Sequence, residues 1–193
     1  MDQTDKRALR RAIRAKLESL PASRFEEAGR AIGAALSGLA SYRNAKVVLA
    51  FLPMPREIDT VPLVESALAD GKIVGVPRIE GDGLAFVRLD RHWREWPRDR
   101  FGIPEPPSDA PSLRLDELAA GPTLVVAPGL AFDRTGGRLG RGKGYYDRFL
   151  ASLEAPSPGP GAVSVVGICL DEQLVGSVPV DERDRGVDAV ISA

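Results

Sequence analysis

The hydrophobic positions of this chain alternate between a helical spacing and short unbroken runs. Near the N-terminus, apolar residues recur at every fourth position among basic ones, which predicts an amphipathic helix over residues 5–19. A second helix is predicted from Ser23 to about Leu39, because Ser23 and Glu26 have the spacing of a capping box. The other predicted helices are residues 61–70, with Thr60 as the cap, 114–120 and 145–153.

The unbroken apolar runs are short, as is typical of strands that are buried on both faces of a parallel sheet. They alternate with the predicted helices, and this order indicates an α/β fold. We therefore expect residues 1–193 to form a single three-layer α/β/α domain with a largely parallel, Rossmann-like sheet. Residues 90–113 are interpreted as a long surface loop, and the Pro/Gly-rich residues 155–161 as a mobile linker. The predicted strands are 46–52, 72–76, 84–88, 123–127, 163–170 and 189–192.

Three loop segments follow predicted strands directly. They are residues 53–59, residues 128–144 and the segment after Leu170. Ligands of α/β sheets bind at the carboxyl ends of the strands. We therefore expect these three segments to lie around one crevice, although they are far apart in the sequence.

Residues 136–147, Gly-Gly-Arg-Leu-Gly-Arg-Gly-Lys-Gly-Tyr-Tyr-Asp, combine five glycines with three basic side chains. Glycine lets a backbone approach a ligand closely and present its N–H groups, so this loop is suited to an anion such as a polyphosphate. Gly137 to Lys143 has the spacing of a Walker A motif, but the following residue is Gly144 instead of Ser or Thr. The hydroxyl that would hold Mg²⁺ is missing, so we reject an ordinary P-loop in favour of another kind of phosphate loop.

Several charged residues have both a functional and an ordinary interpretation. Asp147 lies in the first turn of a predicted helix, where it stabilises the helix dipole or holds Mg²⁺. Glu57 is a surface carboxylate or part of the crevice, and Lys6 and Arg10 share one face of the first helix, which is solvated or binds an anion. A second metal ligand could come from Asp181, Asp184 or Asp188, and composition alone does not separate these from a solvated turn.

Composition excludes several classes of function. The chain carries 26 basic and 27 acidic residues, a formal net charge of −1, which argues against general binding of nucleic acid or membrane surfaces. Cys169 is the single cysteine and His92 the single histidine, so an intramolecular disulfide and a cysteine zinc site are impossible and a Ser-His triad is disfavoured. With no apolar run long enough to span a bilayer and no secretory signal, we expect a cytoplasmic monomer.

Taken together, these segments resemble the 5-formyltetrahydrofolate cyclo-ligase family. The resemblance extends over nearly the whole chain, and its most specific part is Arg138–Asp147. One departure is Phe101, where the family often has Trp or Tyr, and residues 155–161 look like a local insertion. The other matching segments are Lys6-x-x-Leu-Arg10, Phe51–Thr60, Gly102–Pro106 and Pro128–Asp133.

The resemblance implies an enzyme that uses ATP and Mg²⁺ to convert 5-formyltetrahydrofolate into 5,10-methenyltetrahydrofolate, with release of ADP and phosphate. A P-loop-like NTPase and a non-catalytic nucleotide-binding regulator are the alternatives. Carried over position by position, the family's pattern implies that ATP phosphates bind Lys6, Arg10, Arg138, Leu139, Gly140, Arg141, Gly142, Lys143, Gly144, Tyr145 and Tyr146. Of these, Arg141 and Lys143 would act on the transferring phosphoryl group, and Glu57 on the N10 region of the folate. Asp147 and Asp184 would hold Mg²⁺. The folate rings would lie against Phe51, Leu52, Met54, Phe101, Tyr145 and Tyr146.

Overall fold

A six-stranded sheet runs through the centre of the protein, for which a computed structural model describes residues 3–154 and 163–193. The predicted linker at 155–161 lies outside the described residues. The strand order is β3-β2-β1-β4-β7-β8, and every neighbouring pair is parallel except β2 and β3. The strands are β1 (Val47–Leu49), β2 (Ile73–Glu80), β3 (Gly83–Arg88), β4 (Thr123–Ala127), β7 (Val163–Cys169) and β8 (Ala189–Ser192), with a separate two-stranded ribbon of β5 (Ala131–Phe132) and β6 (Arg138–Leu139).

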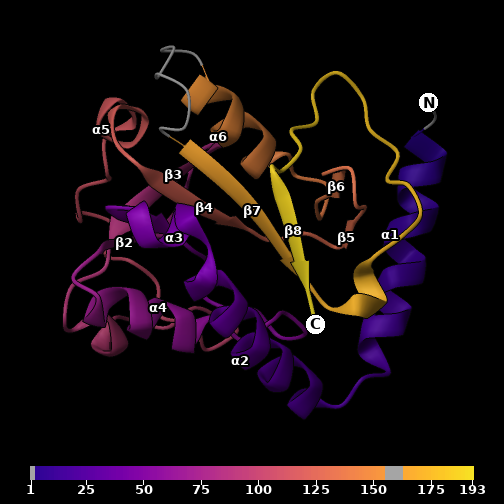
Figure 1. The fold of residues 1–193 in the computed structure, drawn as a ribbon, viewed down its shortest axis with the longest axis horizontal. Coiled ribbons are helices and arrows are strands. Elements are labelled where there is room, and N and C mark those ends of the chain that lie inside the picture. The colour runs from indigo at the N-terminus through magenta and orange to yellow at the C-terminus, as the bar shows by residue number, and fades with distance from the viewer. Residues whose placement is uncertain (1–2, 155–162) are drawn as a thin grey trace.

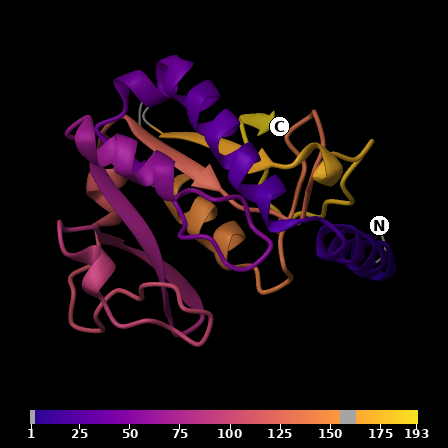
Figure 2. The same ribbon diagram turned by 90° about the horizontal axis from the view of Figure 1, so that it is seen from below.

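Helices cover both faces of this sheet, which confirms the predicted three-layer α/β fold. In Figure 1, α5 and α6 lie above the strands, and α2 and α4 lie below them. Figure 1 and Figure 2 both show α1 at one end of the molecule, beside the segment between β7 and β8. The helices are α1 (Gln3–Glu18), α2 (Ala22–Gly38), α3 (Ala40–Asn44), α4 (Val61–Ala69), α5 (Leu115–Ala120) and α6 (Tyr145–Glu154), with 3₁₀ turns η1 (Trp93–Glu95) and η2 (Asp171–Gln173).

Successive strand residues supply two separate apolar cores. Val48 and Val126 pack with the buried side chains of α2 and α4, whereas Leu49 and Val125 pack with those of α5 and α6. Because side chains alternate across a strand, an apolar run without polar interruptions can fill both faces at once. This is why the short unbroken runs in the sequence correspond to central strands.

The direction of chain winding reverses between β1 and β4. From β1 the chain passes through α4 to β2 on one side, and from β4 it passes through α6 to β7 on the other. Such a reversal opens a crevice at the carboxyl ends of the two strands, because their connecting segments diverge to opposite faces. The predicted crevice therefore lies beside the ends of β1 and β4. Residues of 53–59 and 128–144 line it as expected, whereas the segment after Leu170 contributes no lining residue.

The predicted cap of α2 is wrong, and the predicted cap of α4 is at the expected position but makes no side-chain capping bond. α2 begins at Ala22, one residue before Ser23, and no side chain caps its first turn. Thr60 does precede α4, but its buried hydroxyl donates to the carbonyl oxygen of Phe51 instead of capping the helix. A buried hydroxyl needs a partner, and the loop carbonyl satisfies it while tying the start of α4 to the end of β1.

The predicted strand ends at Val76 and Leu52 are also wrong. β2 continues through Pro77 to Glu80, because beyond Gly75 it pairs only with β3 and needs no N–H on its other side. β1 is regular only over Val47–Leu49. Residues 90–113 were predicted to be a surface loop, but this segment contributes to the core, since Trp93 and Trp96 are buried.

Two glycines of α2 provide a matched test of this packing. A Cβ atom at Gly29 would lie 2.2 Å from the carbonyl oxygen of Asp59, whereas a Cβ at Gly33 would meet no atom within 4 Å. We expect Gly29→Ala to lower the free energy of unfolding by about 1–3 kcal/mol through overpacking. Gly33→Ala is expected to raise it by up to about 1 kcal/mol, since alanine favours helix over glycine. Urea unfolding measures both, and a stable Gly29→Ala variant would contradict the close approach of α2 and the loop.

Candidate active site

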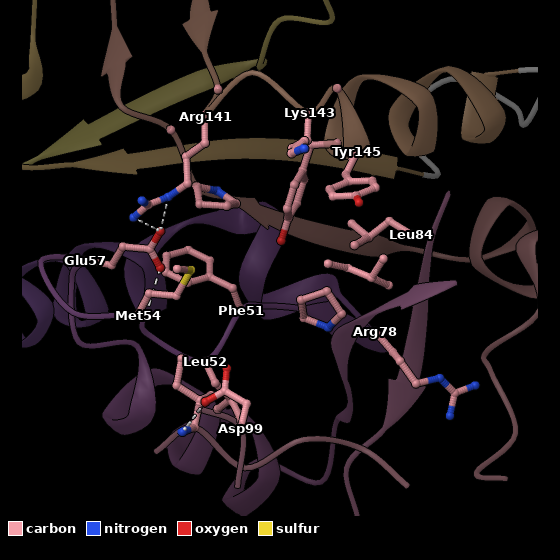
Figure 3. A pocket seen from close by; sticks show the side chains of 18 of the residues that line it. Phe51, Leu52, Met54, Glu57, Arg78, Leu84, Asp99, Arg141, Lys143 and Tyr145 are labelled. Carbon is pink, nitrogen blue, oxygen red and sulfur yellow. Dashed lines mark hydrogen bonds and ion pairs between the residues drawn. The ribbon is translucent and has the colours of Figure 1, made fainter. Parts of the chain in front are cut away.

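A cavity of about 380 Å³ lies at the carboxyl ends of β1 and β4. Its walls come from the segment after β1, the β2–β3 hairpin, residues 99–106 and residues 140–144, which we call the glycine-rich loop. Figure 3 shows Arg141, Lys143 and Tyr145 on one side of this cavity, and Leu52 and Asp99 on the opposite side. The cavity therefore has a cationic rim on the side of the loop and a largely apolar interior.

The glycine-rich loop, residues 140–144, follows strand β6 and leads directly into α6. Gly142 and Gly144 have φ angles of 104° and 68°, which other residues adopt only with strain. The Nε atom of Arg10 donates to the carbonyl oxygen of Gly140 at 2.9 Å, so α1 is fastened to the loop. Lys143 is exposed and makes no hydrogen bond or ion pair with the described residues, which leaves its ammonium group available to an anion.

Glu57 and Arg141 form an ion pair at the cavity wall. The Nε and Nη2 atoms of Arg141 donate to Oε1 of Glu57 at 3.0 and 2.7 Å, and the backbone N–H of Met54 donates to its Oε2 at 3.0 Å. Only 15% of the Glu57 side chain is exposed. The two residues were expected to act separately, on the folate and on the phosphoryl group, and the structure brings them together.

Arg138 holds the start of α6 against the segment that precedes β8. Its Nη2 atom donates to Oδ1 of Asp147 at 2.5 Å, and its Nε atom donates to the carbonyl oxygen of Arg185 at 3.3 Å. The backbone N–H of Arg185 also donates to Oδ1 of Asp147, at 3.1 Å. Because the Arg138 side chain is only 2% exposed, this ion pair is buried and places Asp147 beside residues 184 and 185.

Lys6 is buried between two carboxylates of the same C-terminal segment. Its ammonium group donates to Oδ2 of Asp181 at 2.8 Å and to Oδ2 of Asp184. Burial by itself would lower the pKa of Lys6, but the hydrogen bonds and charges of Asp181 and Asp184 outweigh it and raise the pKa above its ordinary value. α1 is thereby anchored to the site at two points, through Lys6 and through Arg10.

The three candidate metal ligands in the C-terminal segment differ in their free oxygens. Both oxygens of Asp181 accept hydrogen bonds, from Lys6 and from the N–H of Arg183. Asp184 and Asp147 each keep one carboxylate oxygen without a hydrogen bond from the described residues. Asp188 also keeps one oxygen without a hydrogen bond from the described residues, but its other oxygen accepts from the N–H of Val165, which fastens it to β7.

Among the described residues, no three or more His, Cys, Asp or Glu side chains gather into a group that could hold a metal ion. Magnesium usually takes only one or two protein carboxylates and completes its shell with phosphate oxygens and water. Asp147 and Asp184 each offer one free carboxylate oxygen, which is the kind of ligand that magnesium takes.

The aromatic wall of the cavity comes from the start of α6. The ring of Tyr146 meets that of Phe86 edge-on, with 6.3 Å between the ring centroids, and the guanidinium of Arg138 lies 5.8 Å from the centroid of Tyr146. Tyr145 lies beside Leu84 in Figure 3, and its ring contacts the Arg148 guanidinium. These rings and the apolar side chains of the β2–β3 hairpin form a surface suited to a flat aromatic ligand.

Most of the site residues predicted from the sequence line this cavity, but Phe101 does not. Its ring is 43% exposed and borders a second, more open groove beside Trp93 and Arg98. Leu139 is buried in β6, while Lys6, Arg10, Gly142 and Asp184 lie outside the lining. The predicted residues in the lining are Phe51, Leu52, Met54, Glu57, Arg138, Gly140, Arg141, Lys143, Gly144, Tyr145, Tyr146 and Asp147.

Sequence reasoning assigned no site residue to the β2–β3 hairpin or to Asp99, and it noted Gly102–Pro106 only as a segment that resembles the family. Ile79 and Leu84 lie on this hairpin, which the predicted strand end at Val76 had removed from consideration. Asp99 lies at the far side of the cavity, where its Oδ1 atom accepts from the N–H groups of Phe101 and Ile103. Asp99 and Gly102 occupy the first and fourth positions of a turn that is closed by the Gly102 N–H and the Asp99 carbonyl, and this Asp-x-x-Gly spacing is a turn signal that could have been found in the sequence.

A second missed residue is Asp133, which holds the ribbon of β5 and β6 in shape. Its carboxylate accepts from the N–H groups of Thr135, Gly137 and Val178, and from the hydroxyl of Thr135. Burial by itself would raise the pKa of Asp133, but these hydrogen bonds outweigh it and the pKa lies below its ordinary value. The ribbon that carries the glycine-rich loop thus depends on one buried charge.

Comparisons with known proteins agree on one family. The family model described as the 5-formyltetrahydrofolate cyclo-ligase family matches residues 2–193. The chain is 32% identical over 187 residues to the Escherichia coli K12 protein named 5-formyltetrahydrofolate cyclo-ligase, covering 93% of this chain and 96% of the relative. It is 30% identical to the mouse protein of that name, covering 96% of this chain and 92% of the relative. The NMR structure of Aquifex aeolicus 5,10-methenyltetrahydrofolate synthetase superposes with a TM-score of 0.75 at 27% identity, covering 97% of this chain and 89% of that one.

Within the part of the chain that the structure describes, no helix combines the length and the apolar character needed to cross a bilayer.

The hydrogen bonds of Asp133 lead to a test by stability and pH. Asp133→Asn would place an amide N–H₂ against backbone donors, and we expect it to lower the free energy of unfolding by about 2–4 kcal/mol at neutral pH. Because the folded-state pKa is depressed, the stabilisation is present above the unfolded pKa of about 3.9 and is lost as pH falls through the folded pKa.

The difference in stability between wild type and Asp133→Asn should therefore shrink in acid, as measured by urea unfolding from pH 7 to pH 2. Asp82→Asn, at an exposed turn, serves as the matched control with little effect. A constant difference across this range would show that the charge of Asp133 does not stabilise the ribbon.

Proposed function

Since the chain belongs to the 5-formyltetrahydrofolate cyclo-ligase family, we propose that it converts 5-formyltetrahydrofolate and ATP into 5,10-methenyltetrahydrofolate, ADP and phosphate. The observation that carries this proposal is the cavity at the ends of β1 and β4, with the glycine-rich loop on one rim and apolar walls inside. The loop suits a triphosphate, and the walls suit a reduced pteridine. The two substrates would meet at Lys143.

The chemistry explains why such a site needs cations and no protein nucleophile. The N5-formyl group is amide-like, so its carbon is a poor electrophile until the oxygen is made a leaving group. The formyl oxygen attacks the γ-phosphorus and ADP leaves; N10 then attacks the formyl carbon, loses its proton, and phosphate departs as the ring closes. Phosphoryl transfer depends on positioning and charge neutralisation, and a site without a cysteine or a Ser-His pair can supply both.

Lys143 is our candidate for the group that neutralises the transferring phosphoryl. Of the three basic residues in 138–143, Arg138 and Arg141 are paired with carboxylates, while Lys143 has no partner among the described residues. An unpaired ammonium on a loop with two left-handed glycines needs to break no bond before it binds an anion. Arg10 supports the same loop from α1. Arg138 and Lys6, which hold Asp147 and Asp184, would contact phosphate with the N–H groups that these carboxylates leave free.

Magnesium would be held by the free oxygens of Asp147 and Asp184. When bound, it would neutralise charge on the phosphates and orient them. Arg138 fixes the position of Asp147, and Lys6 and the N–H of Asp181 fix that of Asp184. The protein thus supplies two preset carboxylates, and the polyphosphate would supply the remaining oxygens.

Glu57 and Arg141 would act as a unit at the boundary between the two substrates. Glu57 is held by the N–H of Met54 and by Arg141, so its carboxylate has a set orientation in the wall that faces the pteridine. Near N10 this carboxylate could take up the proton released on ring closure, while Arg141 remains close to the phosphoryl group. The apolar side chains Phe51, Leu52 and Met54 would lie against the rings.

We expect Lys143→Ala to lower kcat by roughly 10²–10³-fold, because it removes a cation that stabilises charge in the transition state. The absorbance of the methenyl product, recorded after mixing enzyme, ATP, Mg²⁺ and 5-formyltetrahydrofolate, measures turnover. Lys46→Ala, at the opposite end of β1, is the control, and we expect its activity to be unchanged.

Near-normal turnover in a folded Lys143→Ala variant would show that Lys143 does not have the proposed role. ATP hydrolysis by the wild type without any methenyl product would favour an NTPase instead.

Asp184 and Asp181 form a matched pair for the magnesium proposal. Both bond to Lys6, but only Asp184 has a carboxylate oxygen without a hydrogen bond from the described residues. We expect Asp184→Asn to raise the Mg²⁺ concentration needed for half-maximal turnover by about tenfold or more, since a hard cation loses an anionic ligand. Asp181→Asn should leave the Mg²⁺ titration nearly unchanged. Equal shifts in both variants would mean that the shared contact with Lys6, and not metal binding, is responsible.

A further inference from the structure

The hydroxyl group of Tyr146 is buried and has no hydrogen-bond partner among the described residues. Buried hydroxyls in native proteins almost always have a partner, so an unpaired one calls for a specific reason. Tyr146 lines the cavity and lies in the first turn of α6, directly after the glycine-rich loop. Its position therefore links the unpaired group to the place where the two substrates would meet.

The protein around Tyr146 offers its ring apolar contacts instead of a polar partner. The ring packs against Phe86 and against the apolar clusters that contain Val125 and Ala127. Arg138 approaches the ring, but its guanidinium donates to Asp147 and Arg185. The Glu57 carboxylate is also nearby, but it is held by Arg141 and by the N–H of Met54 and accepts no hydrogen bond from Tyr146. A ligand in the cavity can bring a polar atom to the hydroxyl.

The hydroxyl is suited to donate its proton. A phenol ordinarily loses its proton only well above physiological pH, so the group is neutral there, and a phenolic O–H is a good donor.

The proposed substrate carries a suitable acceptor beside the reacting nitrogen N5. The formyl oxygen must be free to receive the phosphoryl group, and N10 carries a hydrogen and is itself a donor. The 4-oxo group of the pteridine lies next to N5 on the fused rings and is a strong acceptor. We infer that the Tyr146 hydroxyl donates a hydrogen bond to this 4-oxo group and so fixes N5 beside the glycine-rich loop, an inference that rests on the proposed function.

Tyr146→Phe tests the inference because it removes only the hydroxyl. Calorimetric binding of 5-formyltetrahydrofolate without ATP, where no turnover occurs, should weaken about 2- to 13-fold, the range expected for one neutral hydrogen bond. Binding of a non-hydrolysable ATP analogue should not change. The urea midpoint of the ligand-free variant should stay equal or rise, because an unpaired buried polar group has been removed.

Tyr42→Phe is the control, because it should change stability without changing folate binding. The hydroxyl of Tyr42 donates to Asp70 at 2.8 Å, and Tyr42 lies in α3, away from the cavity. Its removal should lower the urea midpoint and leave folate binding unchanged. A lower midpoint in Tyr146→Phe as well would show that its hydroxyl has a structural partner, and the inference would be overturned.

An analogue of 5-formyltetrahydrofolate with hydrogen in place of the 4-oxo group removes the other partner of the proposed hydrogen bond. Wild type and Tyr146→Phe should bind this analogue equally, because the acceptor is gone. A difference that persists with the analogue, or equal binding of 5-formyltetrahydrofolate itself, contradicts the contact. Failure of the proposed function shows separately, as a wild-type protein that binds the folate but makes no methenyl product.

Discussion

The buried ion pair between Arg138 and Asp147 joins three segments that are separate in the sequence. Arg138 belongs to the β5–β6 ribbon, Asp147 to the first turn of α6, and the carbonyl and N–H of Arg185 bond to both side chains from the segment before β8. Removing one partner of a buried ion pair typically costs about 3–5 kcal/mol, because the other charge is left unpaired. The glycine-rich loop lies between these two residues, so the position of Lys143 depends on this pair.

The charges of the site are arranged so that most of them hold one another in place. Lys6 lies between Asp181 and Asp184, and Arg141 pairs with Glu57, which leaves Lys143 as the unpaired cation of the loop within the described residues. Such a network presets the geometry before ligands arrive, and a preset environment needs little reorganisation in the transition state. The site thus combines carboxylates that are held in place with one unpaired ammonium group among the described residues.

The general architecture could be predicted from the sequence because it depends on local patterns. The apolar runs indicated buried strands, and the glycines and basic residues of 136–147 indicated an anion loop at a strand end. The pairing of Glu57 with Arg141 could not be predicted, since 84 positions separate them and only the reversal between β1 and β4 brings them together. Ser23 and Thr60 have the residue types of helix caps, but tertiary contacts decide otherwise: a buried Thr60 bonds to Phe51. Phe101 was assigned to the folate site by the family resemblance, although the family often has Trp or Tyr there, and it faces a neighbouring groove.

A crystal structure of the protein with Mg²⁺, a non-hydrolysable ATP analogue and 5-formyltetrahydrofolate would show whether both substrates meet at the glycine-rich loop. We expect the terminal phosphate to contact the ammonium group of Lys143 and the metal to contact Asp147 and Asp184. The pteridine should occupy the cavity between Leu52 and Tyr145. A triphosphate bound away from the glycine-rich loop, with Lys143 still free in solvent, would contradict this arrangement.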